Sequence, residues 1–355
     1  MIAARSLLNA LVGDAEIEAL FSDEAEVAAM LEAEVALAAA EAEYGLISRE
    51  AARDIARAAA TFRPDWDALR QGMSRDGVIV PALVRQLRAA VDGRHAQDVH
   101  RGSTSQDIVD TGLMLRLKSA VRILEERLDG LASSLSALQE RDGAKRVMAH
   151  TRMQVALPIT VADKIATWTS PLLAAKACLQ EIKPRLLVVQ FGGPVGTRAG
   201  LDDRGAAIAG HMAATLELVV AAPWHADRRR IAEFGSWLSL LSGSLGKIGQ
   251  DVALLAQNEI SAVRLAHSGT SSAMTHKQNP VAAEVLVALG RYNAGLLGTL
   301  HQALIHENER SGAAWTLEWL TLPQMVVAAG AGLRTSMKLV EGLSFLAAGD
   351  YDHAT

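Results

Sequence analysis

The sequence has few aromatic residues, few prolines and a single cysteine. Phe, Trp and Tyr together make up 4% of its 355 residues, and proline occurs only 9 times. A chain with few β-forming aromatics and few helix-breaking prolines, in which Ala and Leu dominate, favours long helices over sheets. The lone Cys178 excludes an intramolecular disulfide framework and indicates a reducing compartment.

Charge and hydropathy exclude further classes of protein. The formal net charge is −5 and the pI is near 6.1, so no overall basic field predicts binding to nucleic acid. No apolar run reaches the roughly 18 residues of a membrane-spanning helix. The N-terminus also lacks the apolar core and cleavage site of a signal peptide. We therefore expect a soluble cytoplasmic protein with neither nucleic-acid nor membrane partners.

Apolar spacing predicts long helices in the larger, second part of the chain. From Leu113 to Leu138 the apolar positions alternate spacings of four and three, which predicts a helix over 107–141. Similar patterns predict helices over 158–180, 231–255, 280–306 and 317–339. The glycines of the 231–255 segment indicate close approach to a neighbouring helix.

These patterns predict an all-α fold with three parts. Shorter helices form an N-terminal domain over 1–95. Long helices form a central five-helix bundle over 96–341, which carries the oligomer contacts and the active site. Residues 342–355 form a tail. The long helices are apolar on more than one face, which is typical of a helical oligomer.

Three polar motifs interrupt the helical pattern. The most informative is Ser271-Ser272-Ala273-Met274-Thr275-His276-Lys277-Gln278-Asn279-Pro280. Asn279 and Pro280 read as the N-cap and first residue of a helix, so the preceding side chains lie on a loop beside a helix N-terminus. A solvated Ser-rich connector is the alternative. The other two motifs are His100-Arg101-Gly102-Ser103-Thr104-Ser105-Gln106-Asp107 and Thr151-Arg152-Met153-Gln154-Val155-Ala156-Leu157-Pro158-Ile159-Thr160.

In this order, the three motifs resemble the signature blocks of the fumarase/aspartase (argininosuccinate lyase) superfamily. The loop motif departs from that pattern at Thr270 and Thr275, where glycine and proline are usual. The resemblance implies a central five-helix bundle that assembles into a homotetramer, with active sites shared between subunits. The sequence itself has no Cys/His/Asp set with metal-ligand spacing and no phosphate-binding glycine loop, so we expect no cofactor and no metal. Members usually continue into a small helical C-terminal domain, which is expected to be short or absent here.

The resemblance also implies roles for individual residues. Ser271 acts as acid or base at the α-carbon, Lys277 and Asn279 hold a substrate carboxylate, and His276 takes part in catalysis. The expected substrate contacts are His100, Arg101, Thr104, Ser105, Gln106, Thr151, Ser272 and Arg310. Capping of the following helix is an equally open role for Thr104 and Ser105. For Arg310, a salt bridge with Glu307 or Glu309 is the alternative.

Arg152 is the sharpest indication of the reaction. Fumarate-forming members carry a histidine here, which assists a poor leaving group, whereas arginine stays protonated and cannot serve as an acid or base. Arginine can bind a carboxylate, which has a pKa of about 4 and reacts without needing a proton. Arg152 is therefore assigned a catalytic role in lactonisation. The segments 191–197 and 309–324 are likewise similar to the lactonising branch, the 3-carboxy-cis,cis-muconate cycloisomerases.

We therefore expect a cycloisomerase of aromatic catabolism (the β-ketoadipate pathway) that acts on a small tricarboxylate. Two alternatives stay open. One is a fumarate-releasing lyase, such as adenylosuccinate or argininosuccinate lyase, with His100 or His276 as proton donor. The other is a non-catalytic helical scaffold.

Overall fold

The computed structural model describes residues 6–270, 274 and 277–346, and helices dominate this part of the chain. The N-terminal helices are α1 (Asn9–Val12), α2 (Ala15–Ala19), α3 (Asp23–Glu43), α4 (Arg49–Ala60), α5 (Trp66–Asp76), α6 (Val80–Ala90) and the 3-10 turn η1 (Ala96–Asp98). The later helices are α7 (Ser105–Asp142), α8 (Val161–Leu186), α9 (Arg204–Leu216), α10 (Arg229–Leu255), α11 (Val281–Gln302) and α12 (Gly312–Glu341).

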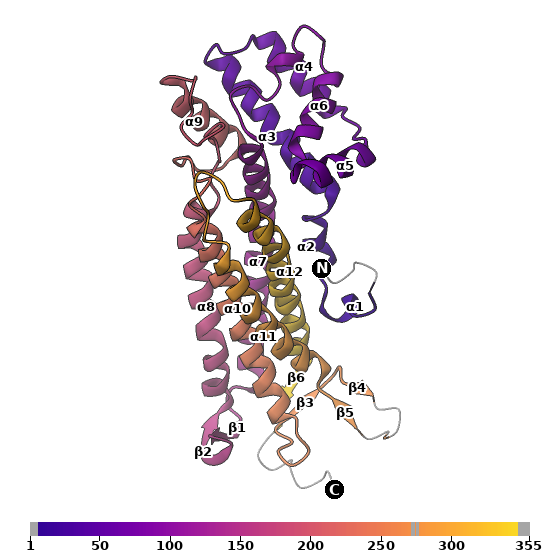
Figure 1. The fold of residues 1–355 in the computed structure, drawn as a ribbon. Coiled ribbons are helices and arrows are strands. Elements are labelled where there is room, and N and C mark those ends of the chain that lie inside the picture. The colour runs from indigo at the N-terminus through magenta and orange to yellow at the C-terminus, as the bar shows by residue number, and fades with distance from the viewer. Residues whose placement is uncertain (1–5, 271–273, 275–276, 347–355) are drawn as a thin grey trace.

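Five long helices, α7, α8, α10, α11 and α12, run side by side as the predicted bundle (Figure 1). Their shared core contains the apolar seam expected for α7, including Leu117, Leu124 and Leu131, each at most 2% exposed. The 38 residues of α7 give the bundle a length of about 57 Å at 1.5 Å per residue. The fold is all-α, as the sequence predicts.

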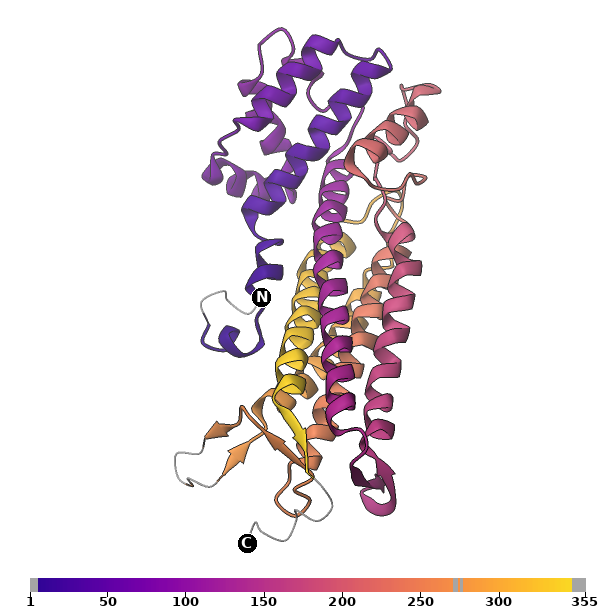
Figure 2. The ribbon, with the colours of Figure 1, turned by 180° about the vertical axis from the view of Figure 1, so that it is seen from behind.

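Helices α3 to α6 and α9 gather at the end of the bundle where α7 begins, here called the upper end (Figure 2). Their side chains form a second core with Val189 and Phe191, which belong to the connection after α8. The upper core therefore includes segments on both sides of residue 95. The domain boundary at that residue stays a prediction.

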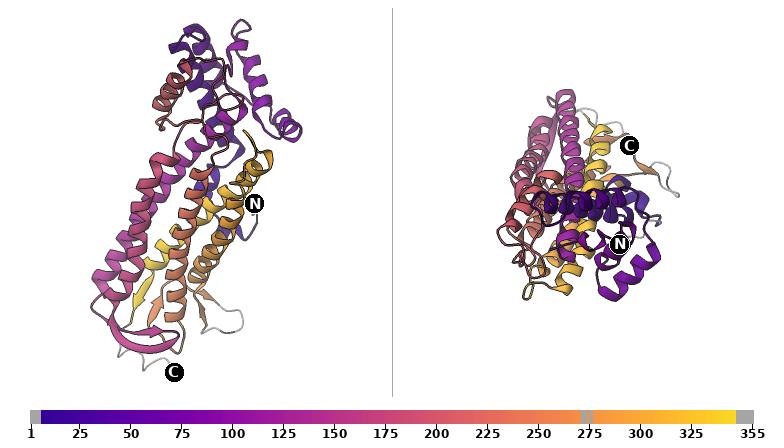
Figure 3. Two further views of the ribbon diagram at one scale, coloured as in Figure 1. Left: turned by 60° about the vertical axis from the view of Figure 1, so that its left-hand side comes forward. Right: turned by 90° about the horizontal axis from the view of Figure 1, so that it is seen from above.

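Short two-stranded sheets lie at the opposite, lower end (Figure 3). Strands β1 (Arg146–Thr151) and β2 (Gln154–Thr160) pair antiparallel and lead into α8. Strand β3 (Val263–Leu265) pairs with β6 (Leu343–Phe345), and β4 (Gly269–Thr270) pairs with β5 (Gln278–Asn279). The sequence analysis did not predict these strands. Their residues are mostly exposed, and although Val155, Leu157 and Ile159 alternate along β2, Pro158 lies within that strand, a position that argues against a strand in sequence.

Glycines of α10 allow α11 to approach closely, as predicted from the sequence. A Cβ at Gly249 would lie 2.4 Å from the Ala283 carbonyl oxygen, and one at Gly246 would lie 3.3 Å from that of Leu286. Gly243 differs, because apart from its own stretch of helix no atom of the described residues lies within 4 Å of its Cβ position. The start of α11 also differs from the prediction. Asn279 belongs to β5, Pro280 is the N-cap, and the helix begins at Val281.

Large apolar side chains are exposed along the bundle and on the β1–β2 hairpin. Leu173 of α8, Leu240 of α10 and Leu320 of α12 are 54%, 70% and 59% exposed. Val155 and Leu157 of β2 are 65% and 73% exposed. Across the described residues, no helix combines the length and hydropathy needed to cross a membrane.

Candidate active site

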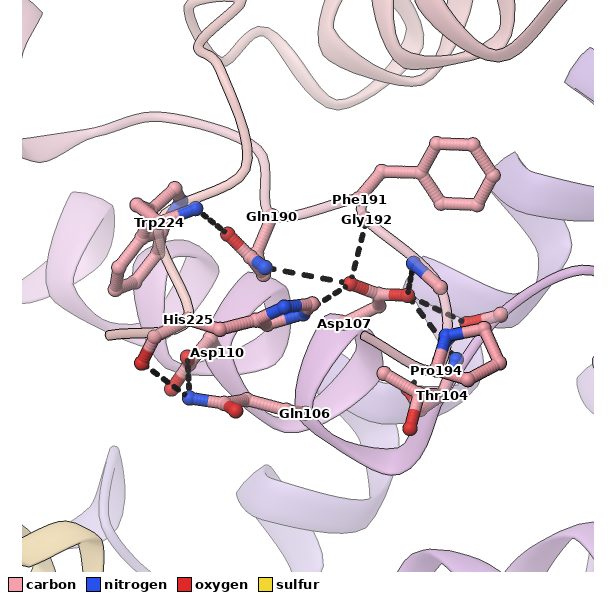
Figure 4. Close-up of polar contacts among 12 residues, drawn as sticks. Thr104, Gln106, Asp107, Asp110, Gln190, Phe191, Gly192, Pro194, Trp224 and His225 are labelled. Carbon is pink, nitrogen blue, oxygen red and sulfur yellow. Dashed lines mark hydrogen bonds and ion pairs between the residues drawn. The ribbon is translucent and has the colours of Figure 1, made fainter. Parts of the chain in front are cut away.

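At the upper end of the bundle, the first polar motif is organised around the buried carboxylate of Asp107, which is 0% exposed (Figure 4). Its Oδ1 accepts hydrogen bonds from the backbone N–H of Gly192 at 2.8 Å and from Gln190 Nε2 at 3.3 Å, and lies 2.8 Å from His225 Nε2. Its Oδ2 accepts from the backbone N–H groups of Gly193 at 2.9 Å and Thr104 at 3.0 Å. One carboxylate thus joins the start of α7 to two loops.

The start of α7 forms a capping box. Thr104 is the N-cap, and Asp107, three residues later, returns its carboxylate to the Thr104 backbone N–H. Gly193 reaches Asp107 with a φ of +71°, a conformation that side-chain-bearing residues rarely adopt. Thr104 is therefore the N-cap of α7, which is one of the two roles that the sequence left open for it. The capping box also fixes the orientation of the first motif.

His100 is fixed by a helix of the N-terminal region. Its Nδ1 lies 2.6 Å from Glu34 Oε1 of α3, and its backbone has a φ of +63°. Burial lowers the pKa of His100, but the adjacent Glu34 carboxylate more than compensates, so the pKa is raised above its usual value. His100 is thereby held towards its cationic form, which suits contact with an anion.

A second buried glutamate lies two turns along α3 from Glu34. Glu41 is 0% exposed, and neither carboxylate oxygen has a hydrogen-bond partner in the described part of the chain. Burial, with a smaller contribution from Glu34, raises the pKa of Glu41 to about 9. At neutral pH Glu41 is therefore protonated and uncharged.

The Glu34→Gln substitution is expected to shift the pH dependence of activity. Glu34 raises the pKa of His100, so the cationic form is present below that pKa and is lost as pH rises through it. Without the carboxylate, His100 loses its proton at a lower pH. The decline of kcat/KM on the alkaline side should therefore move to lower pH, as a pH–rate profile would measure.

Glu41→Gln is the matched control on the same helix. Because Glu41 is uncharged at neutral pH, the amide changes no charge there, and the profile below pH 8 should match the wild type. An unshifted profile in Glu34→Gln would contradict the role given to the Glu34–His100 pair.

Gln106 and Arg310 meet at the same upper end. Arg310, in the connection between α11 and α12, donates from Nε to Gln106 Oε1 at 2.8 Å and from Nη2 to the Pro194 carbonyl at 3.2 Å. No described residue bonds to its Nη1. The predicted alternative, a salt bridge to Glu307 or Glu309, does not appear among the ion pairs of the described residues. Ser105, the first residue of α7, and Arg101, which donates to Asp98 at 3.3 Å, lie in the same motif.

The second polar motif lies at the lower end, on the turn of the β1–β2 hairpin. Thr151 pairs with Gln154, and the two turn residues Arg152 and Met153 have φ values of +49° and +65°. Such a turn normally carries Asn and Gly, so the backbone here is strained. This turn places Arg152, which is exposed, at the tip of the hairpin.

The third motif also lies at the lower end. Lys277 is exposed, and Asn279 pairs with Gly269 in the β4–β5 hairpin that leads into α11. The predicted residues Ser271, Ser272 and His276 lie outside the described residues. This motif and the Arg152 turn therefore sit at the end of the bundle opposite to Gln106 and Arg310 (Figure 1).

Among the described residues, one chain does not bring the three motifs together. The first motif ends in the first turn of α7 and the second follows that helix, so roughly the 57 Å length of α7 separates them. No side chain spans this distance. A catalytic centre that uses both ends must therefore combine residues from more than one chain.

Sequence reasoning missed the buried charges beneath the first motif. Arg228 lies between Asp110 and Glu318 and is 1% exposed in its side chain. In the sequence it belongs to the run Arg228-Arg229-Arg230, which is typical of a solvated surface. Asp107 is the exception, because its position three residues after a capping threonine is a sequence pattern that predicts a capping box.

Chemically, these groups can bind and polarise carboxylates. Cationic or donor side chains stand at both ends: His100 and Arg310 above, and Arg152 and Lys277 below. Guanidinium and ammonium groups bind carboxylates strongly and stabilise charge that develops on their oxygens.

Comparisons with known proteins agree with this chemistry. A family model described as lyase matches residues 6–291. A 3-carboxy-cis,cis-muconate cycloisomerase of Pseudomonas aeruginosa is 39% identical over 96% of this chain and 76% of its own length. A crystal structure of the 3-carboxy-cis,cis-muconate lactonizing enzyme from Pseudomonas putida superposes with a TM-score of 0.91 at 36% identity, over 98% of this chain and 79% of that one. A nitrosuccinate lyase of Streptomyces davaonensis is 35% identical over 95% of this chain and 74% of its own length.

Proposed function

The chain belongs to the lyase family, and from that premise we propose that it is a cycloisomerase that closes 3-carboxy-cis,cis-muconate to 4-carboxymuconolactone. Several relatives at 36–39% identity carry the cycloisomerase name, which favours this reaction over the release of fumarate. The observation that carries the proposal from the site itself is Arg152, a permanent cation on an exposed, strained turn.

The reaction rearranges one molecule without losing an atom. A carboxylate oxygen of the substrate forms a bond to one carbon of a conjugated C=C bond, and the π bond of that C=C breaks. Its electron pair takes up a proton at the neighbouring carbon, which is α to another carboxylate. Arg152 binds the attacking carboxylate, for which it needs no proton transfer. Lys277 and Asn279 hold the carboxylate on which charge develops, and Ser271 delivers the proton.

The upper end completes the proposed site. His100 and Arg310 supply positive charge for a further carboxylate of the tricarboxylate substrate. Arg101, Thr104, Ser105, Thr151, Ser272 and His276 stay assigned to the same site as proposed contacts or catalytic groups.

The proposed assembly is a homotetramer in which each site combines motifs from different subunits. Two observations support it. The length of α7 separates the motifs of one chain, and large apolar side chains are exposed on α8, α10 and α12. Packing these helices antiparallel against those of another copy would bury the side chains and place an upper end beside a lower end.

The test is an ultraviolet assay of the purified protein with 3-carboxy-cis,cis-muconate, which follows loss of the conjugated diene. Adenylosuccinate, argininosuccinate and nitrosuccinate are assayed in parallel for release of fumarate. We expect loss of the diene and no fumarate. Fumarate from any of the three would instead favour a lyase, and no turnover of any substrate would favour a non-catalytic scaffold.

A further inference from the structure

We propose that Arg228 is a positioning residue that orients Arg310 through Asp110 and Gln106, and that Gln106 itself does not touch the substrate. This inference rests on the proposed function for the identity of the ligand that Arg310 binds. The contacts between Arg228 and Arg310 are all within one chain, so they do not depend on the assembly.

The proposed chain of contacts begins with two buried ion pairs. Arg228 donates from Nη1 and Nη2 to the two oxygens of Asp110 at 2.6 and 3.0 Å. It donates from Nε and Nη2 to the two oxygens of Glu318 at 2.8 and 2.6 Å. The guanidinium also lies over the Trp224 ring, 4.6 Å from its centroid. Arg228 is thus held in one orientation and cannot itself reach a substrate.

Asp110 transmits this orientation to Gln106. Its Oδ1 also accepts from Trp315 Nε1 at 3.2 Å, and its Oδ2 accepts from Gln106 Nε2 at 3.1 Å. With the guanidinium on one side and the indole N–H on the other, the carboxylate is fixed in position. It can accept hydrogen bonds but not donate them, so the side-chain group of Gln106 that faces it must be the NH₂.

The orientation of the Gln106 amide follows from its two donors. Nε2 donates to Asp110 and to the His225 carbonyl, the latter at 3.0 Å, which uses both of its hydrogens (Figure 4). The amide oxygen must then point the other way, where it accepts from Arg310 Nε at 2.8 Å. Gln106 is 0% exposed, so it has neither a free donor nor an accessible surface for a substrate.

The fixed amide oxygen of Gln106 in turn orients the guanidinium of Arg310. Its Nε is held by Gln106 and its Nη2 by the Pro194 carbonyl, so two of its three nitrogens are fixed by the protein. The Nη1 edge of the guanidinium is left for an anion. A guanidinium held in advance loses less conformational entropy when it binds a carboxylate.

A purely stabilising role is the alternative for this buried ion cluster. Buried ion pairs contribute little net stability compared with apolar residues of the same volume, because desolvation of the charges offsets their attraction. The two roles predict different kinetics. Loss of stability lowers the amount of active enzyme, whereas misorientation of Arg310 weakens substrate binding by the enzyme that remains folded.

The experiment compares Arg228→Lys and Gln106→Met with the control Arg230→Lys. Arg230 stacks over the same Trp224 ring, 4.8 Å from its centroid, but has no hydrogen bond to Asp110 or Gln106 among the described residues. We expect both test variants to raise KM for 3-carboxy-cis,cis-muconate by about tenfold, with a smaller change in kcat, and the control to change neither. In an Arg310→Ala background, neither test substitution should lower the residual kcat/KM further. A further, additive loss of kcat/KM in that background, or unchanged KM in both single test variants, would overturn the proposal.

Crystal structures of the same variants give a readout that does not depend on activity. In Gln106→Met, which keeps the Arg228 ion pairs, and in Arg228→Lys, the Arg310 guanidinium should leave its position beside residue 106. In Arg230→Lys it should stay. If the wild type does not turn over the muconate, the proposed substrate is wrong, and the position of Arg310 still decides the inference. An unmoved Arg310 in both test variants would refute it.

Discussion

Two separately inactive variants are expected to recover activity when their subunits are mixed. Arg310→Ala removes the cation of the upper end, and Arg152→Ala removes that of the lower end. Each homogeneous protein should be nearly inactive, because every site lacks one cation. When the subunits are dissociated, mixed in equal amounts and reassembled, about a quarter of the sites should combine two intact ends.

The physical reason is the length of α7. About 57 Å of helix lies between the two motifs of one chain, so in the proposed assembly the residues removed by the two substitutions belong to different sites. The measurement is the rate of loss of the conjugated diene before and after mixing. As the matched control, Arg310→Ala is mixed with Gln106→Met. These two residues are in contact in one chain, so mixing should restore no activity beyond that of Gln106→Met alone. Recovery in that control, or none in the test pair, would contradict sites shared between subunits.

Asp107→Ala is expected to cause a large loss of stability. It would leave the backbone N–H groups of Gly192 and Gly193 and the His225 ring without their partner in the interior. Each orphaned buried donor costs about 1–3 kcal/mol, so the free energy of unfolding should fall by roughly 4 kcal/mol or more. Chemical denaturation of the purified variant would measure this loss.

Asp129→Ala is the control on the same helix. Its carboxylate forms a surface ion pair with Lys176 and is 56% exposed, so its loss should change the free energy of unfolding by less than about 1 kcal/mol. Equal denaturation midpoints for Asp107→Ala and the wild type would show that the carboxylate does not hold the loops to α7.

The long helices could be predicted from sequence because their pattern is local. The heptad-like spacing predicts α7 over 107–141, and the structure has Ser105–Asp142, where a capping threonine and a C-terminal glycine set the ends. The β1–β2 hairpin could not be predicted in this way. Its strands are mostly exposed, and its turn has positive φ at Arg152 and Met153 rather than at Asn and Gly.

The candidate site likewise has a part that local sequence predicts and a part that only the tertiary structure shows. The polar motifs stand out in the sequence because they interrupt apolar helices. The buried residues that hold these motifs do not stand out in the sequence, because they are distant along the chain. Glu34 lies 66 residues from His100, and Glu318 lies 90 residues from Arg228. Gln106 shows the limit most clearly. Its place in a polar motif predicts substrate contact, whereas its complete burial and three hydrogen bonds assign it to the orientation of Arg310 in our proposal.

In the proposed assembly, the length of α7 sets the distance between the upper and lower ends of each copy. The upper end of one copy must meet the lower end of another, so the number of residues in the helix sets whether the two sets of cations face the same substrate. Removing one turn from α7 would shorten it by about 5.4 Å. A hydrogen bond tolerates only a few tenths of an ångström. The length of this helix is therefore constrained by the chemistry at its two ends as well as by the packing along it.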